Sequence, residues 1–375
     1  MSLRRLRALV LGQEPPPPDN VYATLTASGI PVASVDCRTC PNPCEEGHAE
    51  YPRRFSIDME STMLGSVKPF RRQILISTGK SDWDREVTET IGSLAALVAQ
   101  THPPKLPDPL PDPPPPIAID LDEKLIPPIP GVFTSADSTR LSILNGSHKT
   151  VAADDEHHTV LVFPDYTMVV DVPATLDGAK ELWRTALDAT LPRMGGTPAT
   201  GSFQTWILPY SCVIMLCSHK RRDNRCAIAA PKLEHGQRHA RISCIHAHCV
   251  AAFIKSLECN GWTAHTQLEH VVDPPLEHFS GTPEEKGRHI ADQLRALSAG
   301  KRALILRNSH MGGHKYAGNC IIYTPQGSSV WYGRVTTHEV ECIVVNTILA
   351  GLVLPPLLRG GMDLSRPGCP TLHDW

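Results

Sequence analysis

The stretch HMGGHKYAGN at residues 310–319 decides the organisation of this chain, together with CSHKRRDNRC at residues 217–226. The first carries two imidazoles on a glycine-rich loop, and the second carries two thiols on a strongly basic one. Two thiolates with two imidazoles form a ligand set for zinc or for a [2Fe–2S] cluster of mixed ligation. Two glycines between the histidines disfavour a helix by roughly 1 kcal/mol each, which favours a loop wrapped closely around something. The alternative is a pair of ordinary loop histidines.

Both stretches follow predicted strands. The apolar run Ser211–Leu216 leads directly into Cys217, and the strand Arg302–Leu306 leads to His310. Ligand sites in α/β folds lie at such strand ends. The rest of this half is predicted to contain helices over Ile245–Leu257, Asp292–Leu297 and Glu339–Leu352, and strands over Cys320–Tyr323 and Val330–Val335. Strand, helix, strand, hairpin, helix is the element order of a thioredoxin-like module.

The first half is predicted to be a second, small α/β domain. Its apolar runs indicate strands within residues 73–80, 140–145, 159–163 and 166–172, and its periodicity indicates helices at 84–100 and 180–191. Twelve prolines within residues 103–130 exclude regular structure there and indicate a spacer. The predicted organisation is a flexible N-terminus (1–20), an N-terminal domain (21–195) with a proline-rich insertion (101–131), a C-terminal domain (196–362) and a flexible tail (363–375).

Composition narrows the functional classes. With 36 basic and 39 acidic residues the net charge is −3, so no bias toward nucleic acid or a membrane surface follows. The longest apolar run, near residues 342–358, is too interrupted for a membrane span. The twelve cysteines come without a secretory signal pattern, which favours reduced thiols and metal ligands over disulfides.

A second group of metal-binding residue types lies near the N-terminus. Cys37, Cys40 and Cys44 are followed by His48, with two prolines between the last two cysteines. Three thiols and an imidazole this close could hold a metal, and Cys37 with Cys40 could form a redox pair. The alternative is three reduced cysteines without a role.

Two further cysteine sets compete for the ligand role. The run CIHAHC at residues 244–249 is dense in ligand types, but on a helix Cys244 and His248 share one face while His246 and Cys249 share another. The four side chains therefore cannot converge without unwinding of the helix. Cys212, five residues before Cys217, is predicted to be a core residue.

The paired stretches, with residues 330–335 (VWYGRV) and 359–361 (RGG), resemble the sucrase/ferredoxin-like family. The resemblance extends into the first half through residues 63–69 (MLGSVKP), 78–83 (TGKSDW), 143–148 (ILNGSH) and 163–166 (FPDY). These fungal and plant proteins are thioredoxin-like ferredoxins. No close-set acidic pair in this chain indicates a glycosidase, whatever the family's name suggests.

The resemblance implies two thioredoxin-like α/β domains, the C-terminal one a ferredoxin whose [2Fe–2S] cluster is held by Cys217, Cys226, His310 and His314. One iron would take two thiolates and the other two imidazoles. Imidazole ligands make a cluster less negative and raise its reduction potential. The basic residues around Cys217 could offset the cluster's charge or receive an acidic partner. Lys315 and Asn319 are candidates for contacts around the ligands.

The leading hypothesis is an electron carrier rather than an enzyme, with donor and acceptor proteins as partners. The alternatives are a thiol-redox enzyme using Cys37, Cys40 or Cys44, and a binding module in which zinc replaces the cluster. The terminal Asp374-Trp375 resembles a tail by which cytosolic assembly machinery recognises some iron–sulfur proteins, although His373 departs from the expected aliphatic residue. This tail favours the cytoplasm, and three arginines among leucines in residues 1–11 make mitochondria the alternative.

Overall fold

The computed structural model describes residues 21–38, 40–41, 44–45, 48, 56–101, 128–192, 201–221, 225 and 248–375. The predictions for residues 1–20, for most of the proline-rich insertion, for Cys226, and for Cys244 and His246 lie outside the described residues. Within them, no helix combines the length and apolar character needed to cross a bilayer.

The strands form one mixed sheet of twelve, in the order β2-β12-β11-β10-β7-β9-β3-β1-β4-β5-β6, with β8 also paired to β9. Their bounds are β1 Arg72–Ser77, β2 Val132–Phe133, β3 Leu141–Gly146, β4 His157–Phe163, β5 Thr167–Pro173, β6 Gln204–Ile207, β7 Cys212–Cys217, β8 Thr263–His265, β9 Arg302–Asn308, β10 Cys320–Tyr323, β11 Ser329–Tyr332 and β12 Leu358–Met362. The predicted mixed α/β class is confirmed, and the division into two thioredoxin-like domains stays a prediction.

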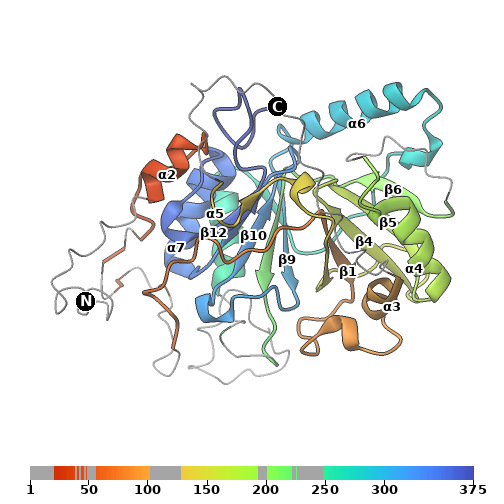
Figure 1. Ribbon diagram of the computed structural model, residues 1–375, viewed down its shortest axis with the longest axis horizontal. Helices are drawn as coiled ribbons and strands as arrows, with labels where there is room; N and C mark the ends of the chain where they lie inside the picture. Colours follow the sequence, from red (N-terminus) through yellow and green to blue (C-terminus); the bar gives the residue numbers. More distant parts are fainter. Residues whose placement is uncertain are drawn as a thin grey trace, which may run out of the picture.

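Helices flank this sheet on both outer sides (Figure 1). The α-helices are α2 Val21–Ala27, α3 Leu94–Thr101, α4 Leu176–Leu182, α5 His248–Cys259, α6 Pro283–Leu297 and α7 Thr337–Cys342. Short 3-10 turns cover Val87–Glu89, Ser135–Asp137, Leu276–His278, His314–Tyr316 and Pro355–Leu357, and π-helical segments extend α4 over Trp183–Leu187 and α7 over Ile343–Leu349.

Two helices begin nine or ten residues away from their predicted first residue. The helix expected from residue 84 begins only at Leu94, because Gly92 has a φ of +78° and the preceding residues form a 3-10 turn. Conversely, α6 begins nine residues before the predicted Asp292. Thr282 and Glu285 form a capping box at its start, with Pro283 in the first turn.

Successive side chains along the central strand β7 pack alternately into two different hydrophobic cores. In β7, Ile214 and Leu216 pack on the face covered by α5 and α7, whereas Val213 and Met215 point into the core between the two halves of the sheet. Burial on both faces explains why this strand has a continuous apolar sequence. A third core lies between β1, β4 and the helices α3 and α4.

The two halves of the sheet repeat one pattern. In the first half β1 pairs in parallel with β3 and antiparallel with β4, which pairs antiparallel with β5. In the second half β7, β9, β10 and β11 pair in the same way, so that Ser77 corresponds to Cys217 and Phe163 to Tyr323. The halves join where β3 meets β9 through the corresponding residues Gly146 and Asn308.

The same approximate two-fold relation brings corresponding side chains together in the central core. The rings of Phe163 and Tyr323 stack with centroids 4.1 Å apart. The Tyr323 hydroxyl donates a 2.9 Å hydrogen bond to Gln73 Oε1, and the Gln73 amide donates to Ser142. β1 and β10 are not neighbours in the sheet, so these contacts show that its two halves face each other.

We expect Tyr323→Phe to lower the free energy of unfolding by about 1–3 kcal/mol, because Gln73 Oε1 would be left buried without this donor. Tyr323→Ala should cost about 3–5 kcal/mol, since it also removes the ring from the core. Urea unfolding measures both. Val272→Ala is the control, because Val272 is 99% exposed. A Tyr323→Ala loss as small as the control's would contradict the facing arrangement of the halves.

Stability should also depend on pH through His148, which is fully buried after β3 with Nε2 3.3 Å from the Thr159 carbonyl oxygen. Burial lowers the pKa of His148 to about 4. Between pH 6.5 and 4 the unfolded chain binds a proton here that the folded chain does not. The free energy of unfolding therefore falls as pH falls, by up to about 3 kcal/mol from this residue. Urea unfolding at pH 7 and 4.5 should show a smaller drop for His148→Gln, and equal drops would contradict this assignment.

Candidate metal centres

The ends of β7 and β9 form the first candidate centre. The two strands are parallel neighbours with Cys217 opposite Asn308, so the Cys217 thiol and the loop that begins at Ser309 leave the same edge of the sheet. Cys217 is fully buried, and its backbone N–H donates to the Asn319 carbonyl oxygen at 3.1 Å. The strand ends thus bring the first predicted ligand to the far end of the histidine loop.

Glycines shape this loop as its sequence predicts. Gly312 and Gly313 adopt left-handed φ values of +84° and +70°, and a one-turn 3-10 helix begins at His314. The His310 and His314 rings have centroids 5.9 Å apart. The loop therefore turns back on itself and brings the two imidazoles near each other. The turn needs glycines because other residues rarely adopt left-handed backbone angles.

Arg359 is hydrogen-bonded to the histidine loop and to the residues around it, a role that its position in the sequence does not predict. It is buried and donates to Asn319 Oδ1 at 2.8 Å, to the Gly312 carbonyl oxygen at 3.3 Å and to Ser66 Oγ at 3.1 Å. Burial lowers the pKa of Arg359 to about 10, against the opposite influence of the nearby Cys217 thiol. The guanidinium therefore stays charged at neutral pH and is a fixed cation beside this thiol.

The two side chains predicted to lie around the ligands have different positions. Asn319 is buried and donates from Nδ2 to the Gly313 carbonyl oxygen at 3.1 Å, so it links Arg359 to the loop backbone. Lys315 extends toward Asp58 and Ser61, and its Nζ lies 4.5 Å from the centroid of the Tyr316 ring. It contacts the segment that covers the loop.

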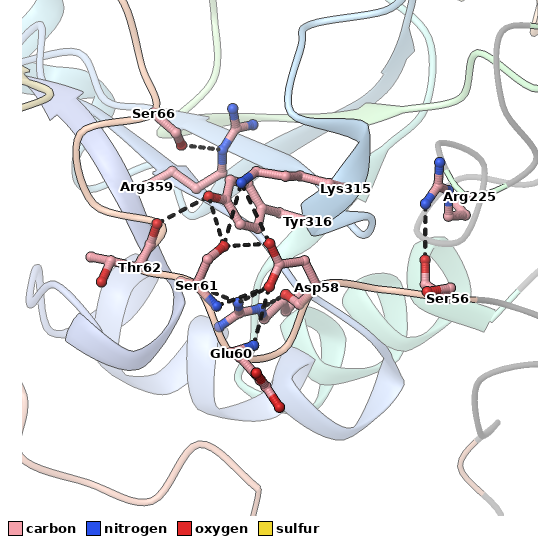
Figure 2. Close-up of polar contacts among 11 residues, drawn as sticks. Ser56, Asp58, Glu60, Ser61, Thr62, Ser66, Arg225, Lys315, Tyr316 and Arg359 are labelled. Carbon is pink, nitrogen blue, oxygen red and sulfur yellow. Dashed lines mark hydrogen bonds and ion pairs between the residues drawn. The ribbon is translucent and has the colours of Figure 1, made fainter. Parts of the chain in front are cut away.

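Residues 56–66 form that covering segment, which we call the strap (Figure 2). The Asp58 carboxylate accepts hydrogen bonds from Ser61, which lower its pKa. Tyr316 donates from its hydroxyl to the Thr62 carbonyl oxygen at 3.0 Å, and Arg334 donates to the backbone of Asp58 and Ser61 at 2.7 and 2.8 Å. The strap therefore contacts the loop at Lys315 and Tyr316, and its Ser66 hydroxyl accepts a hydrogen bond from Arg359.

His219 is a further residue of this centre that the sequence analysis did not single out. It is fully buried, its ring centroid lies 5.8 Å from that of His310, and among the described residues neither ring nitrogen has a hydrogen-bond partner. Its Nδ1 lies 3.8 Å from the Asp82 carboxylate. Burial lowers the pKa of His219, against an opposing influence of Cys217. The sequence signal that could have indicated it is its position two residues after Cys217 in the basic stretch.

A second candidate centre contains three of the four N-terminal residues predicted to form a site. Cys40, Cys44 and His48 come together with His338 of α7, and their ligand atoms all lie within 4.8 Å of one another. Cys40 Sγ is 3.0 Å from His338 Nδ1. This Cys2His2 group could hold a metal ion. His338 could not be found from spacing, because it lies almost 300 residues further along the chain.

Cys37 does not belong to this group. It is buried in the core near Cys342. Its pKa is raised mainly by burial and to a smaller extent by the neighbouring Cys342 thiol. Cys212 and Cys249 are also core residues, and burial raises the pKa of each to about 12. Cys212 was predicted to be a core residue. The position of Cys249 agrees with the view that the 244–249 run does not converge on one metal, although most of that run lies outside the described residues.

The segment 363–375, for which the sequence predicts flexibility, contacts the body of the protein. Leu372 is buried, the His373 ring lies 2.9 Å from the Ile348 carbonyl oxygen, and Gln326 donates to the His373 carbonyl oxygen. The Trp375 ring is 45% exposed beneath the Arg295 guanidinium. The terminal aromatic ring thus rests on the protein's own surface while keeping an accessible face.

Comparison with known proteins identifies relatives of this chain. The model of a family described as sucrase/ferredoxin-like matches residues 63–360. Proteins named altered inheritance of mitochondria protein 32 match shorter segments: 46% identity over 52 residues in Meyerozyma guilliermondii, 48% over 52 in Clavispora lusitaniae and 47% over 55 in Debaryomyces hansenii. These segments are 14% of this chain and 18%, 19% and 20% of the three relatives, so the matches span about a fifth of their length. No solved structure matches the chain.

Two adjacent glycines offer a test of the loop geometry. Gly312→Ala and Gly313→Ala should each cost about 1–2 kcal/mol of unfolding free energy, because both residues have left-handed backbones. Gly313→Ala should cost more, since its methyl group would overlap the Arg359 guanidinium, whereas the space around Gly312 is open. Urea unfolding of the two variants compares these costs. Equal losses would show that Arg359 does not pack against the loop.

Proposed function

Because this chain belongs to the sucrase/ferredoxin-like family, we propose that it is an electron-transfer protein with a [2Fe–2S] cluster bound by Cys217, Cys226, His310 and His314. The observation that carries the proposal is that Cys217 ends β7 beside the end of β9, which leads to His310, whose ring centroid lies 5.9 Å from that of His314. Cys226 enters through the sequence, as the second thiol of the same basic stretch.

The described residues suit such a cluster in three respects. Cys217 is fully buried, as is His219, whose ring centroid lies 5.8 Å from that of His310. Left-handed glycines let the backbone between His310 and His314 curve around a bound group. Arg359 supplies a fixed positive charge next to thiolates that would otherwise repel one another. A bound cluster would supply one-electron transfer, and imidazole ligands would raise its potential.

The protein's own contribution would be to hold the ligands rigidly and to control the charge around them. Arg359 and Asn319 would hold the loop by hydrogen bonds to the Gly312 and Gly313 carbonyl oxygens, and the strap would hold it by its bond to the Tyr316 hydroxyl. Donor and acceptor proteins would dock where the basic stretch reaches the surface, at residues such as Lys220 and Arg221. The order β-α-β-β-β-α of β1, α3, β3, β4, β5 and α4 is repeated by β7, α5, β9, β10, β11 and α7, with β2 inserted in the first half and β8 and α6 in the second. This repeated order supports a thioredoxin-like scaffold as part of this proposal.

The alternatives receive less support. A thiol-redox enzyme needs an accessible, low-pKa thiolate, whereas Cys37 is buried with a raised pKa. Zinc in place of the cluster would use the same four ligands and is separated by the experiment below. The relatives' printed name refers to inheritance of mitochondria and favours the mitochondrial alternative over the cytoplasm. Recognition of Trp375 by iron–sulfur assembly machinery is a further part of the proposal.

We expect Cys217→Ser or Cys226→Ser to abolish visible absorption and to remove iron, because serine is a poor soft-metal ligand. His310→Cys and His314→Cys should retain a cluster with a lower potential, since thiolate adds negative charge. Anaerobic purification with a spectrum, an iron count and redox titration measures these effects. Cys259→Ser is the matched control, because Cys259 is an exposed free cysteine. Colourless wild-type protein with one zinc in this centre would overturn the proposal.

A further inference from the structure

The group formed by Cys40, Cys44, His48 and His338 lies outside the proposed cluster site. It offers two thiols and two imidazoles, which is the ligand set of many structural zinc sites. Cys40 and His338 are buried, while Cys44 and His48 are half-buried. The spacing of four residues between Cys40, Cys44 and His48 lets one short segment provide three ligands, and a helix provides the fourth.

The dimensions of the group fit one ion. Two thiolates bound to one zinc cannot lie further apart than twice the bond length, or about 4.6 Å, and tetrahedral neighbours lie about 3.3–3.8 Å apart. All four ligand atoms lie within 4.8 Å of one another. A two-iron cluster would place two metals and two sulfides between its ligand pairs and needs wider spacing. The group therefore fits a mononuclear site whose widest pair of ligand atoms closes by no more than about 1–1.5 Å when zinc binds.

One of the ligands is held in place before any metal binds. His338 lies in the first turn of α7, where the Thr336 hydroxyl accepts from its backbone N–H. Glu339 completes a capping box by accepting from the Thr336 backbone N–H at 2.7 Å. The other three ligands belong to a segment without regular secondary structure among its described residues. Binding a metal would therefore fasten that segment to a helix that is already formed.

The same N-terminal segment is anchored at its other end. Leu25 and Ile30 are buried in the core beside α5 and α7. The Val353 backbone N–H donates to the Pro31 carbonyl oxygen at 2.7 Å, and Ala33 donates back to Val353 at 2.9 Å. From there the chain runs to Cys40 and reaches α7. A metal at this point would attach the N-terminal segment to α7 at a second place, in addition to its contacts at Leu25–Ala33.

We propose that Cys40, Cys44, His48 and His338 bind one structural zinc ion that fastens the N-terminal segment to α7. Two thiols release their protons to solvent as zinc binds, so two thiolates balance the charge of the ion. Zinc is favoured because it accepts four-coordinate Cys2His2 ligation and needs no open position for a substrate. The role assigned is structural, with no electron transfer at this ion.

The test counts zinc and iron separately in full-length protein purified anaerobically. Wild type should hold about one zinc per chain, and Cys44→Ser and His48→Ala should hold less than about 0.2, with unchanged iron. These two ligands are half-buried, so their replacement disturbs the core least. Cys259→Ser and His270→Ala are matched controls at exposed positions and should keep the zinc.

A second measurement tests the fastening role. Without zinc, trypsin should cleave after Arg38 at least about tenfold faster, because the segment that follows is no longer held to α7. Cys217→Ser separates this proposal from the proposed function, since it should remove iron and leave both zinc and the cleavage rate unchanged. Wild-type protein that binds no zinc under reducing conditions would overturn the assignment, as would full zinc content in both ligand variants.

Discussion

The two halves of the sheet are joined by a short antiparallel pairing between β3 and β9, which we call the crossing. β3 and β9 share a single residue pair, Gly146 with Asn308, and the residues on either side complete the join by reciprocal hydrogen bonds. The Ser147 N–H donates to the Arg307 carbonyl oxygen, and the Ser309 N–H donates to that of Asn145, both at 2.9 Å. Each serine hydroxyl also accepts from the opposite strand, from Arg307 and Asn145 respectively, at 3.0 Å. Two pairs of corresponding residues thus satisfy each other, which places both halves and the start of the histidine loop.

The two halves carry different side chains at equivalent strand ends, and the candidate cluster site lies in the second half. His148 and His310 directly follow the two crossing serines and correspond by the two-fold relation. Yet Ser77 occupies the place of Cys217 and donates no thiol; its hydroxyl accepts from the Thr159 N–H. His148 is buried with its pKa lowered, whereas His310 lies half-buried beside His314 and His219. The two halves share a pattern of strands and differ in the side chains at equivalent strand ends, which are a buried serine and a buried histidine in the first half, and a buried cysteine and a half-buried histidine in the second.

The sequence predicts most strands because their side chains are buried and apolar, and it predicts ligands that lie close together in the chain. Spacing placed Cys40, Cys44 and His48 in one candidate site, but it placed Cys37 there equally, and Cys37 is buried in the core instead. His338 and Arg359 were not recognised by spacing, because they act through contacts that no local pattern encodes. His338 lies almost 300 residues after Cys40, and Arg359 contacts Asn319 and Ser66, which are 40 and 293 residues earlier in the chain. Helix ends were predicted less well for a similar reason. Gly92 and the Thr282 capping box act within single turns, below the length over which hydrophobic periodicity can be read.

The two candidate centres share one structural connection. The Arg334 N–H donates to the Tyr316 carbonyl oxygen and the Val335 N–H to that of Gly318, each at 3.0 Å, so the segment before α7 is bonded along the histidine loop. Three residues later this segment provides His338 to the second centre. The family match begins at residue 63 and ends at 360, close to the hydrogen bond between Ser66 and Arg359 that supports the loop. Cys40, Cys44 and His48 precede that range. A zinc ion bound by Cys40, Cys44, His48 and His338 would hold the chain before residue 63 to the segment that is bonded to the histidine loop. It would therefore support this loop without changing any residue that lines it.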